Sequence, residues 1–289
     1  MKNILITITI VACCYSCGIT TPKYLFAPNT PNVFCTKKKK DMLVAVNFAS
    51  TYPGESTADG TLKSNGIDIQ TAYAISNSFA IKCDLFAKAE LDESNRTEQD
   101  EYYYKLNYKR KGVEISGAYN ILVGTKKKNS ININTGIGIG SDAFSGRYVQ
   151  ETSANRYFNA KQFKWFIMPV LNVQLADNYG IIIAYRVSVL RFNSINTNDK
   201  ELRTGLFSEI DKQNSVFASS LIDNQFGFNK LKGIKFRIGV GTNLMMNNLN
   251  YQNPNNILLR NREQYLYHTK YVTLGTILNL QTMFKKNKQ

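Results

Sequence analysis

The chain has 289 residues, a hydrophobic content of 43% and a formal net charge of +15. Its mean hydropathy of −0.28 and the lack of long apolar runs after the first 16 residues argue against membrane-spanning helices, but they fit strands that alternate apolar and polar residues. The positive charge is typical of nucleic-acid binders, yet the basic clusters Lys37–Lys40, Lys126–Lys128 and Lys285–Lys288 accompany no recognisable nucleic-acid motif, so no nucleic-acid partner is predicted.

The amino terminus has the pattern of an export signal. Lys2 precedes a short apolar stretch from Ile4 to Ala12, and small residues follow, which predicts a signal peptide over residues 1–16. Residues 14–18 resemble a lipobox, in which the thiol of Cys17 would carry the lipid after cleavage. Ordinary cleavage of the signal without lipidation is the alternative. Residues 17–41 are then a lipid-tethered linker.

From residue 42 onward, the chain consists of alternating runs rich in β-branched and aromatic residues. In the last run, residues of one parity suit lipid and those of the other suit water: Val272, Leu274, Thr276, Leu278 and Leu280 against Tyr271, Thr273, Gly275, Asn279 and Gln281. Ten strands are expected, near 42–50, 66–76, 79–90, 104–121, 129–140, 158–176, 180–192, 215–228, 233–247 and 265–284. Because the eighth run alternates poorly, eight or twelve strands are alternatives.

The connections between these runs alternate in length. Those near residues 77–78, 123–129, 177–179 and 229–232 are short, and the intervening ones are long. Outer-membrane barrels have short periplasmic turns and longer outer loops. The sequence therefore predicts an all-β fold, a closed antiparallel up-and-down transmembrane β-barrel over residues 42–284 with a basic tail at 285–289. A soluble periplasmic barrel or sandwich is the competing architecture.

The lipobox-like Tyr15-Ser16-Cys17-Gly18, the proline- and asparagine-containing stretch 28–33 and the strand-and-turn pattern together resemble Bacteroidota-type outer-membrane β-barrel lipoproteins. The resemblance implies a location in the outer membrane. Residues 18–21 lack the acidic cluster that resembles a surface-export signal in such bacteria, so the lipid-anchored amino terminus is expected on the periplasmic side. The expected lipid partners are phospholipid and, as a second candidate, lipopolysaccharide.

The residues expected to face the barrel lumen include charges of both signs. They are Asp68, Lys82, Asp84, Lys88, Glu114, Lys164, Arg186, Lys235 and Arg237. Unpaired buried charges are costly, so mutual pairing in a plugged interior is favoured over a conducting pore. The glycines of Gly136-Ile137-Gly138-Ile139-Gly140 are interpreted as small inward residues of a strand, because a nucleotide loop would need a following helix.

The sequence predicts no catalytic residues, no metal site and no cofactor. His268 is the single histidine, which excludes a metal site with two imidazoles. The expected function is a non-enzymatic barrel with a structural role, or with a binding role in its long loops toward an unidentified protein or small molecule. The alternatives are a narrow solute- or lipid-transport barrel and a lipid hydrolase that uses His268.

Overall fold

The structure is a computed structural model. It describes residues 31–36, 38–51, 60–94, 104–124, 129–148, 156–176, 178–198, 214–228, 231, 233–245 and 268–284. Across these residues, no helix has both the length and the apolar character needed to cross a membrane.

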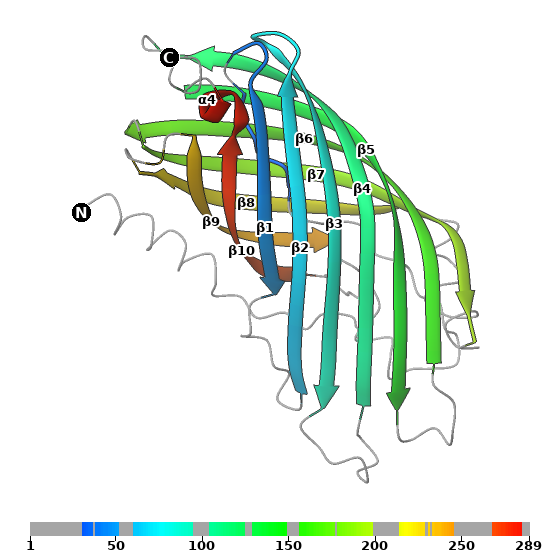
Figure 1. Ribbon diagram of the computed structural model, residues 1–289. Helices are drawn as coiled ribbons and strands as arrows, with labels where there is room; N and C mark the ends of the chain where they lie inside the picture. Colours follow the sequence, from blue (N-terminus) through cyan, green and yellow to red (C-terminus); the bar gives the residue numbers. More distant parts are fainter. Residues whose placement is uncertain are drawn as a thin grey trace.

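The described strands form one closed antiparallel barrel (Figure 1). Its strands are β1 (Met42–Thr51), β2 (Gly60–Ala74), β3 (Phe79–Ser94), β4 (Tyr104–Val123), β5 (Asn129–Tyr148), β6 (Arg156–Ala176), β7 (Tyr179–Thr197), β8 (Ser215–Gly227), β9 (Ile234–Met245) and β10 (His268–Asn279). Each strand pairs with its neighbours in sequence, and β1 pairs with β10, where Phe48 lies opposite Leu274. The predicted ten-stranded up-and-down barrel is therefore confirmed.

Side chains alternate between the two sides of the wall. Along β7, Ile182, Ala184 and Arg186 are buried, whereas Ile183 and Tyr185 are exposed. The exposed side chains of the wall are mostly large and apolar, whereas a water-soluble barrel exposes mainly polar side chains. The interior is polar and the outer surface is apolar, as the two-residue period of the sequence predicts.

The two ends of the barrel differ. At one end, here the turn end, the strands are joined through 75–78, 124–128, 177–178 and 228–233. At the other, the loop end, the connections are 52–59, 95–103, 149–155, 198–214 and 246–267. The contrast agrees with the expected alternation, but the first four loop-end connections are shorter than expected because β2, β3, β5 and β7 continue into them.

The last strand ends earlier than the alternation suggests. The sequence predicts a strand to residue 284, but β10 stops at Asn279 and a short helix, α4 (Leu280–Phe284), follows. The side-chain oxygen of Asn279 accepts a hydrogen bond from the Thr282 N–H, at 3.0 Å. Asparagine in this position caps a helix start, so the strand prediction for residues 280–284 is wrong for a local reason.

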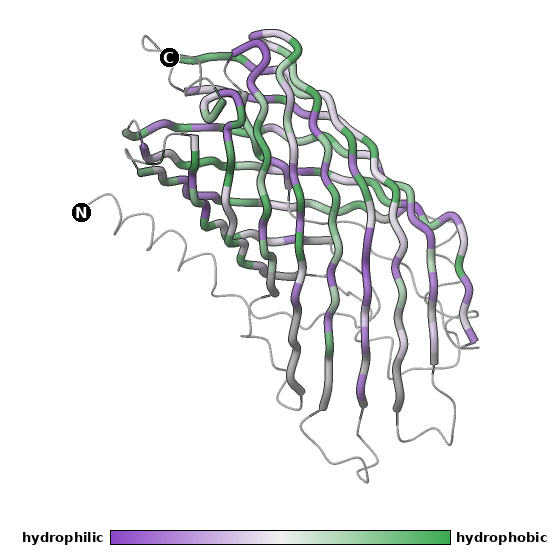
Figure 2. Tube along the Cα trace, in the orientation of Figure 1, coloured by the Kyte–Doolittle hydropathy of each residue, from purple (hydrophilic) through white to green (hydrophobic). Residues whose placement is uncertain are grey.

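The wall is uneven in height. Strands β3 to β7 contain 16 to 21 residues, whereas β1 and β8 to β10 contain 10 to 13. In Figure 1 the strands β2 to β5 run well below the ends of β1 and β10. Figure 2 shows a hydrophilic run in the lower part of β4, beyond the more apolar upper part of the wall. One side of the barrel therefore projects beyond its apolar zone.

Candidate functional site

The charged residues expected in the lumen lie inside the barrel, and most are fully enclosed. Asp68, Lys82, Asp84, Glu114, Lys164, Arg186 and Arg237 are buried, and Lys88 and Lys235 are half-buried. The structure brings several of them together across strands that are distant in sequence, so the candidate site is the lumen itself.

Glu114 is the centre of an ion cluster in which it contacts two cations. Its Oε2 lies 3.1 Å from Arg186 Nη1, and its Oε1 forms an ion pair with Lys164. The Arg186 guanidinium also lies over the Phe166 ring, 5.3 Å from the ring centroid. Three strands, β4, β6 and β7, are thereby joined across the lumen.

A second group bridges the seam where the barrel closes. Arg237 Nε donates to Asp223 Oδ1 at 3.0 Å, and Arg237 Nη1 donates to Gln70 Oε1 at 3.0 Å. A weaker contact of 3.4 Å joins Nη1 to Asn47 Oδ1. Since these residues belong to β8, β9, β1 and β2, one arginine links four strands around the β1–β10 closure.

A third pair lies farther toward the loop end. Arg110 Nε donates to Asp142 Oδ1 at 2.9 Å, and Gln162 Nε2 donates to the same oxygen at 3.2 Å. Arg110, Asp142 and Asp223 are not among the lumen-facing residues predicted from the sequence. Arg110 lies four residues from Glu114 on β4, so alternation could have identified it as lumen-facing. Asp223 lies in the poorly alternating eighth strand, where alternation does not identify the lumen-facing residues.

The segment 31–36 lies inside the barrel. The side chain of Asn32 donates hydrogen bonds to Asp84 Oδ1 and to the Thr71 carbonyl, and the backbone carbonyl of Asn32 accepts from Lys82 Nζ at 3.3 Å. At the other end of the segment, Asn120 Nδ2 donates to Thr36 Oγ1 at 3.1 Å. The sequence predicts a linker here, and its entry into the lumen was not predicted.

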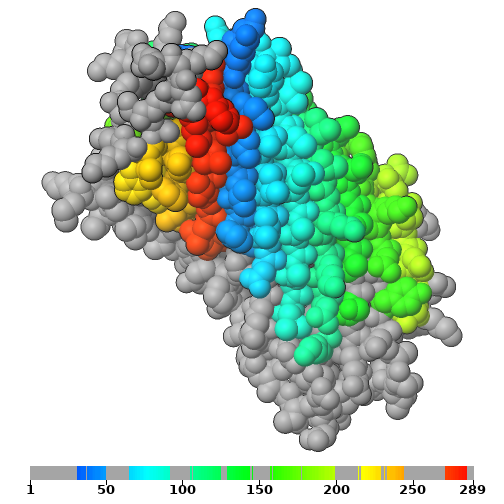
Figure 3. All heavy atoms as spheres, in the orientation of Figure 1, coloured from blue at the N-terminus to red at the C-terminus, as the bar shows by residue number. Residues whose placement is uncertain are grey.

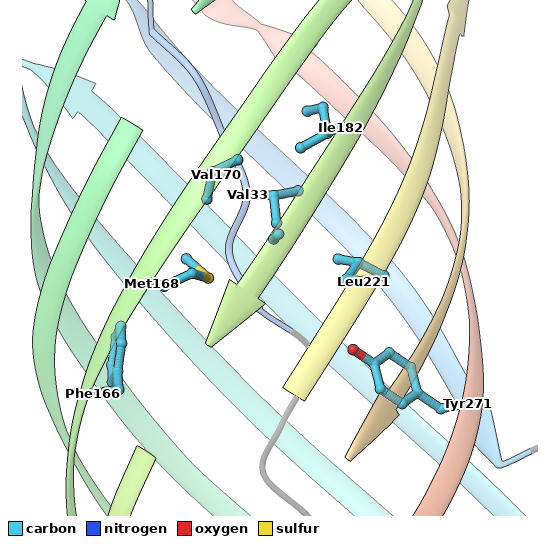
Figure 4. Close-up of a cluster of buried hydrophobic side chains, with 8 residues drawn as sticks. Val33, Phe166, Met168, Val170, Ile182, Leu221 and Tyr271 are labelled. Carbon is cyan, nitrogen blue, oxygen red and sulfur yellow. The ribbon is translucent and has the colours of Figure 1, made fainter. Parts of the chain in front are cut away.

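Val33 anchors the segment through apolar contacts. It packs in a cluster with Phe166, Met168, Val170, Ile182, Ala184, Leu221 and Tyr271. Figure 4 shows these side chains converging on Val33 from the surrounding strands. Val33 and Phe34 are 0% and 1% exposed, so the segment is as buried as a protein core.

A cavity of about 530 Å³ remains at the turn end. Phe34, Ile182 and Ile277 contribute apolar surface, and Gln225 and Lys235 contribute polar groups. Phe34 and Cys35 of the inserted segment form part of its lining. Its volume is within the range of small-molecule sites.

The remaining residues singled out from the sequence are the cysteines and His268. Cys17 lies outside the described residues. His268 is the first residue of β10, opposite Leu244, and its side chain is not among those described. Within the described ranges, no group of three or more histidine, cysteine or acidic side chains could hold a metal ion. Among the described residues, Cys35 and Cys83 are not joined in a disulfide.

No protein-family model and no curated protein matches the chain. Among solved structures, it is similar to the translocator domain of the autotransporter NalP from Neisseria meningitidis, with 6% identity, a TM-score of 0.49, and coverage of 85% of this chain and 90% of that one. The outer membrane protease OmpT from Escherichia coli gives 9% identity, a TM-score of 0.40, and coverage of 82% and 95%. The COG4313 outer membrane channel from Pseudomonas putida F1 gives 8% identity, a TM-score of 0.40, and coverage of 87% of this chain and 99% of that one. At these identities, no activity is carried over to this chain.

Proposed function

We propose that the protein is an outer-membrane β-barrel whose lumen is sealed by its own segment 31–36 and by buried ion pairs, and which serves as a membrane-embedded support for its loop-end connections. The observation that carries the proposal is the combination of an apolar outer wall with a filled polar interior. A water-soluble protein would gain nothing from exposing so many large apolar side chains.

The height of the apolar zone supports insertion in a membrane. On β4, the outward residues from Val113 to Val123 include Ile115, Tyr119 and Ile121, and the first outward charge beyond them is Lys111. A ten-residue step along a strand tilted by roughly 40° rises about 25 Å, which matches the apolar band of outer-membrane barrels. Lysine at its edge fits the polar headgroup level.

The filled lumen supports a closed barrel. An open pore would require Asn32, Val33 and Phe34 to leave contacts in which they are almost completely buried. It would also expose Asp84, which accepts a hydrogen bond from the Asn32 side chain, and Lys82, which donates to the Asn32 backbone carbonyl. Removing one partner from a buried polar group costs roughly 1–3 kcal/mol, and several such groups would be affected together.

The lipid anchor at Cys17 is a further part of the proposal. Thr36 contacts Asn120 near the turn end, and Asn32 contacts Asp84, which lies deeper along the wall in register with Glu114. The described segment therefore runs toward the turn end as its residue numbers increase. If the anchor lies at the turn end, which is the periplasmic side expected from the sequence, the chain before Asn32 has to reverse its direction to reach that end. If the anchor lies at the loop end, no reversal is required.

The side of the anchor is testable with an epitope tag inserted after Thr21. If the chain enters from the loop end, antibody binds intact cells, and replacement of Cys17 by serine abolishes lipid labelling. Antibody binding only after the outer membrane is permeabilised would support the periplasmic anchor instead.

Conductance tests the sealed lumen. The purified full chain, reconstituted in a planar bilayer and shown to be inserted by protection from added protease, is expected to be electrically silent. A variant that lacks residues 31–36 removes the plug; its folded fraction is expected to conduct. Steady conductance of the unmodified protein would overturn the proposal.

A narrow transport barrel is the second candidate, and the cavity at the turn end favours it. Phe34 and Cys35 form part of the cavity lining, so movement of the segment would join the cavity to the rest of the lumen. In this case the unmodified protein would conduct or release an entrapped solute from vesicles, and a disulfide holding the segment to the wall would stop that release.

A further inference from the structure

A shallow depression of about 850 Å³ lies on the outer wall over strands β2 to β6, and Asn193 of β7 completes its lining. These strands, coloured from cyan to green, form the side of the barrel that faces the viewer in Figure 3. The lining combines apolar side chains, among them Ile69, Leu85 and Val113, with the two lysines Lys111 and Lys161. The depression is therefore apolar on one side and basic on the other.

The register of the strands explains the shape. At one level of the wall, neighbouring strands place Ile67, Ala87, Lys111, Ser141 and Lys161 side by side. Ala87 and Ser141 are small, and they lie between longer side chains in this row. Consequently the wall is indented at Ala87 and Ser141, and the two lysines flank Ser141 at a separation of about 10 Å across two strand spacings.

The next level toward the turn end is entirely apolar. It contains Ile69, Leu85, Val113 and Ile139, which occupy directly opposed positions on β2 to β5. Leu85 and Ile139 are 50% and 60% exposed, so this surface is available to a hydrocarbon chain. A ligand that fits both levels has acyl chains on the apolar side and anionic groups at the lysines.

The charge around the depression has a single sign. On strands β2 to β7, the outward-facing charged side chains that the structure describes are all basic: Lys105, Lys109, Lys111, Lys161 and Arg191. Arg191 is paired with Phe163, two residues along β6 from Lys161. Basic residues next to a membrane attract anionic lipid headgroups, and lysine is a common phosphate ligand.

We infer that this depression is a binding site for a phosphorylated glycolipid of the lipid A type, with Lys111 and Lys161 contacting phosphate and the row Ile69–Ile139 contacting acyl chains. The inference rests on the proposed membrane barrel. It commits to the lipid of the outer leaflet because the lysines lie on the loop-end side of the apolar zone, and loop ends of outer-membrane barrels face outward.

The test uses the full chain inserted in phosphatidylcholine vesicles that contain either diphosphoryl lipid A or phosphatidylglycerol. Lipid that remains bound after detergent extraction is counted by native mass spectrometry. The unmodified protein is expected to retain lipid A in preference to phosphatidylglycerol. The double variant Lys111→Gln/Lys161→Gln is expected to retain about tenfold less, since each lysine near a headgroup contributes measurably to binding.

The matched control is Lys105→Gln/Lys109→Gln, which removes the same charge from the same face of β4, beyond the depression. It is expected to retain lipid A like the unmodified protein. Equal retention by both double variants overturns the inference, and equal retention of phosphatidylglycerol overturns the choice of lipid. If the unmodified protein fails to insert in either vesicle, the membrane-barrel proposal fails as well; insertion without selective retention removes the inference alone.

Discussion

Individual buried residues determine how the lumen is closed. Glu114 contacts two cations, Lys164 and Arg186, and all three side chains are almost inaccessible to solvent. A buried ion is tolerated when it is paired, and removal of one partner leaves the others desolvated and unpaired. The most sensitive position in such a cluster is the residue that two others share.

Glu114→Gln is therefore expected to destabilise the barrel by about 3–5 kcal/mol, because Lys164 and Arg186 would lose their common counter-charge. Urea unfolding of the protein in lipid vesicles measures the effect. Lys109→Gln, a change on the exposed face of the same strand, is expected to change stability by about 0.5 kcal/mol or less. Equal stabilities of the two variants would show that the cluster contributes nothing to the fold.

The glycine run of β5 has a structural role beside this cluster. A Cβ atom added at Gly138 would lie 2.8 Å from Glu114 Cγ and 3.3 Å from Lys164 Cε. The glycine thus leaves room for the ion pair, which agrees with the interpretation of this run as small inward residues. A phosphate-binding loop is not needed to explain it.

Gly138→Ala is expected to cost about 1–3 kcal/mol, the usual cost of overpacking a filled interior. The control is Gly117→Ala, where the nearest atom to an added Cβ is in the Phe79 ring at 3.3 Å on the outer face. That ring can move, so a smaller loss is expected. The comparison uses the same unfolding measurement, and a larger loss in the control would contradict the role assigned to Gly138.

At the scale of the element, the inserted segment is the feature that the sequence did not predict. Residues 31–36 have no two-residue period. Their hydrogen-bond partners lie on β2, β3, β4 and β5, and the apolar partners of Val33 lie on β6, β7, β8 and β10, all far away in the chain. Local patterns identify strands because each strand meets a lipid face and a water face. A segment enclosed on all sides leaves no such pattern.

Cys35 provides a native reporter of this element. Asn32→Leu removes the hydrogen bonds from the Asn32 side chain to Asp84 and to Thr71, so the segment should leave the wall more often. Since the loss of these hydrogen bonds costs roughly 1–3 kcal/mol, maleimide modification of Cys35 is expected to accelerate about fivefold or more. Peptide-resolved mass spectrometry gives the rate, and the unmodified protein at the same maleimide concentration is the reference.

The control for this experiment is Asn65→Leu, an exposed position of β2 that none of the described contacts of the segment includes. It is expected to leave the modification rate of Cys35 unchanged. Acceleration of equal size in both variants would mean that the barrel as a whole loosens, and the segment would then not be an independent element.

The strand boundaries show which part of an element the sequence determines. Alternation identified the number of strands and their centres, because the apolar zone imposes it there. Beyond this zone the pattern fades, so β5 and β7 extend to Tyr148 and Thr197, past the ends at 140 and 192 that alternation predicts. Hydrogen bonds to the neighbouring strand continue there, as the pair Tyr104–Tyr148 shows, and they need no apolar residue.

At the scale of the molecule, the uneven wall separates two environments along the same strands. On β5, the outward residues Ile131, Ile133, Ile137 and Ile139 lie in the apolar zone, and Ser145 lies beyond it on the same face. The closed barrel was predictable from the alternation of lipid-facing and water-facing residues and from the alternation of short and long connections. The ion pairs across the lumen were not, because parity gives the side of a residue and not its partner.

The two zones predict that the loss of stability caused by a charged substitution depends on its position along the strand. Ile137→Arg places a charge in the apolar zone and is expected to lower stability in lipid vesicles by about 2–4 kcal/mol, whereas Ser145→Arg, on the same strand and face, is expected to cost about 0–1 kcal/mol. Both positions are exposed, so neither change removes core packing, and the difference reports hydrocarbon around the wall. Equal costs at the two positions in vesicles would mean that β5 is surrounded by water along its whole length, and a membrane barrel could not be maintained.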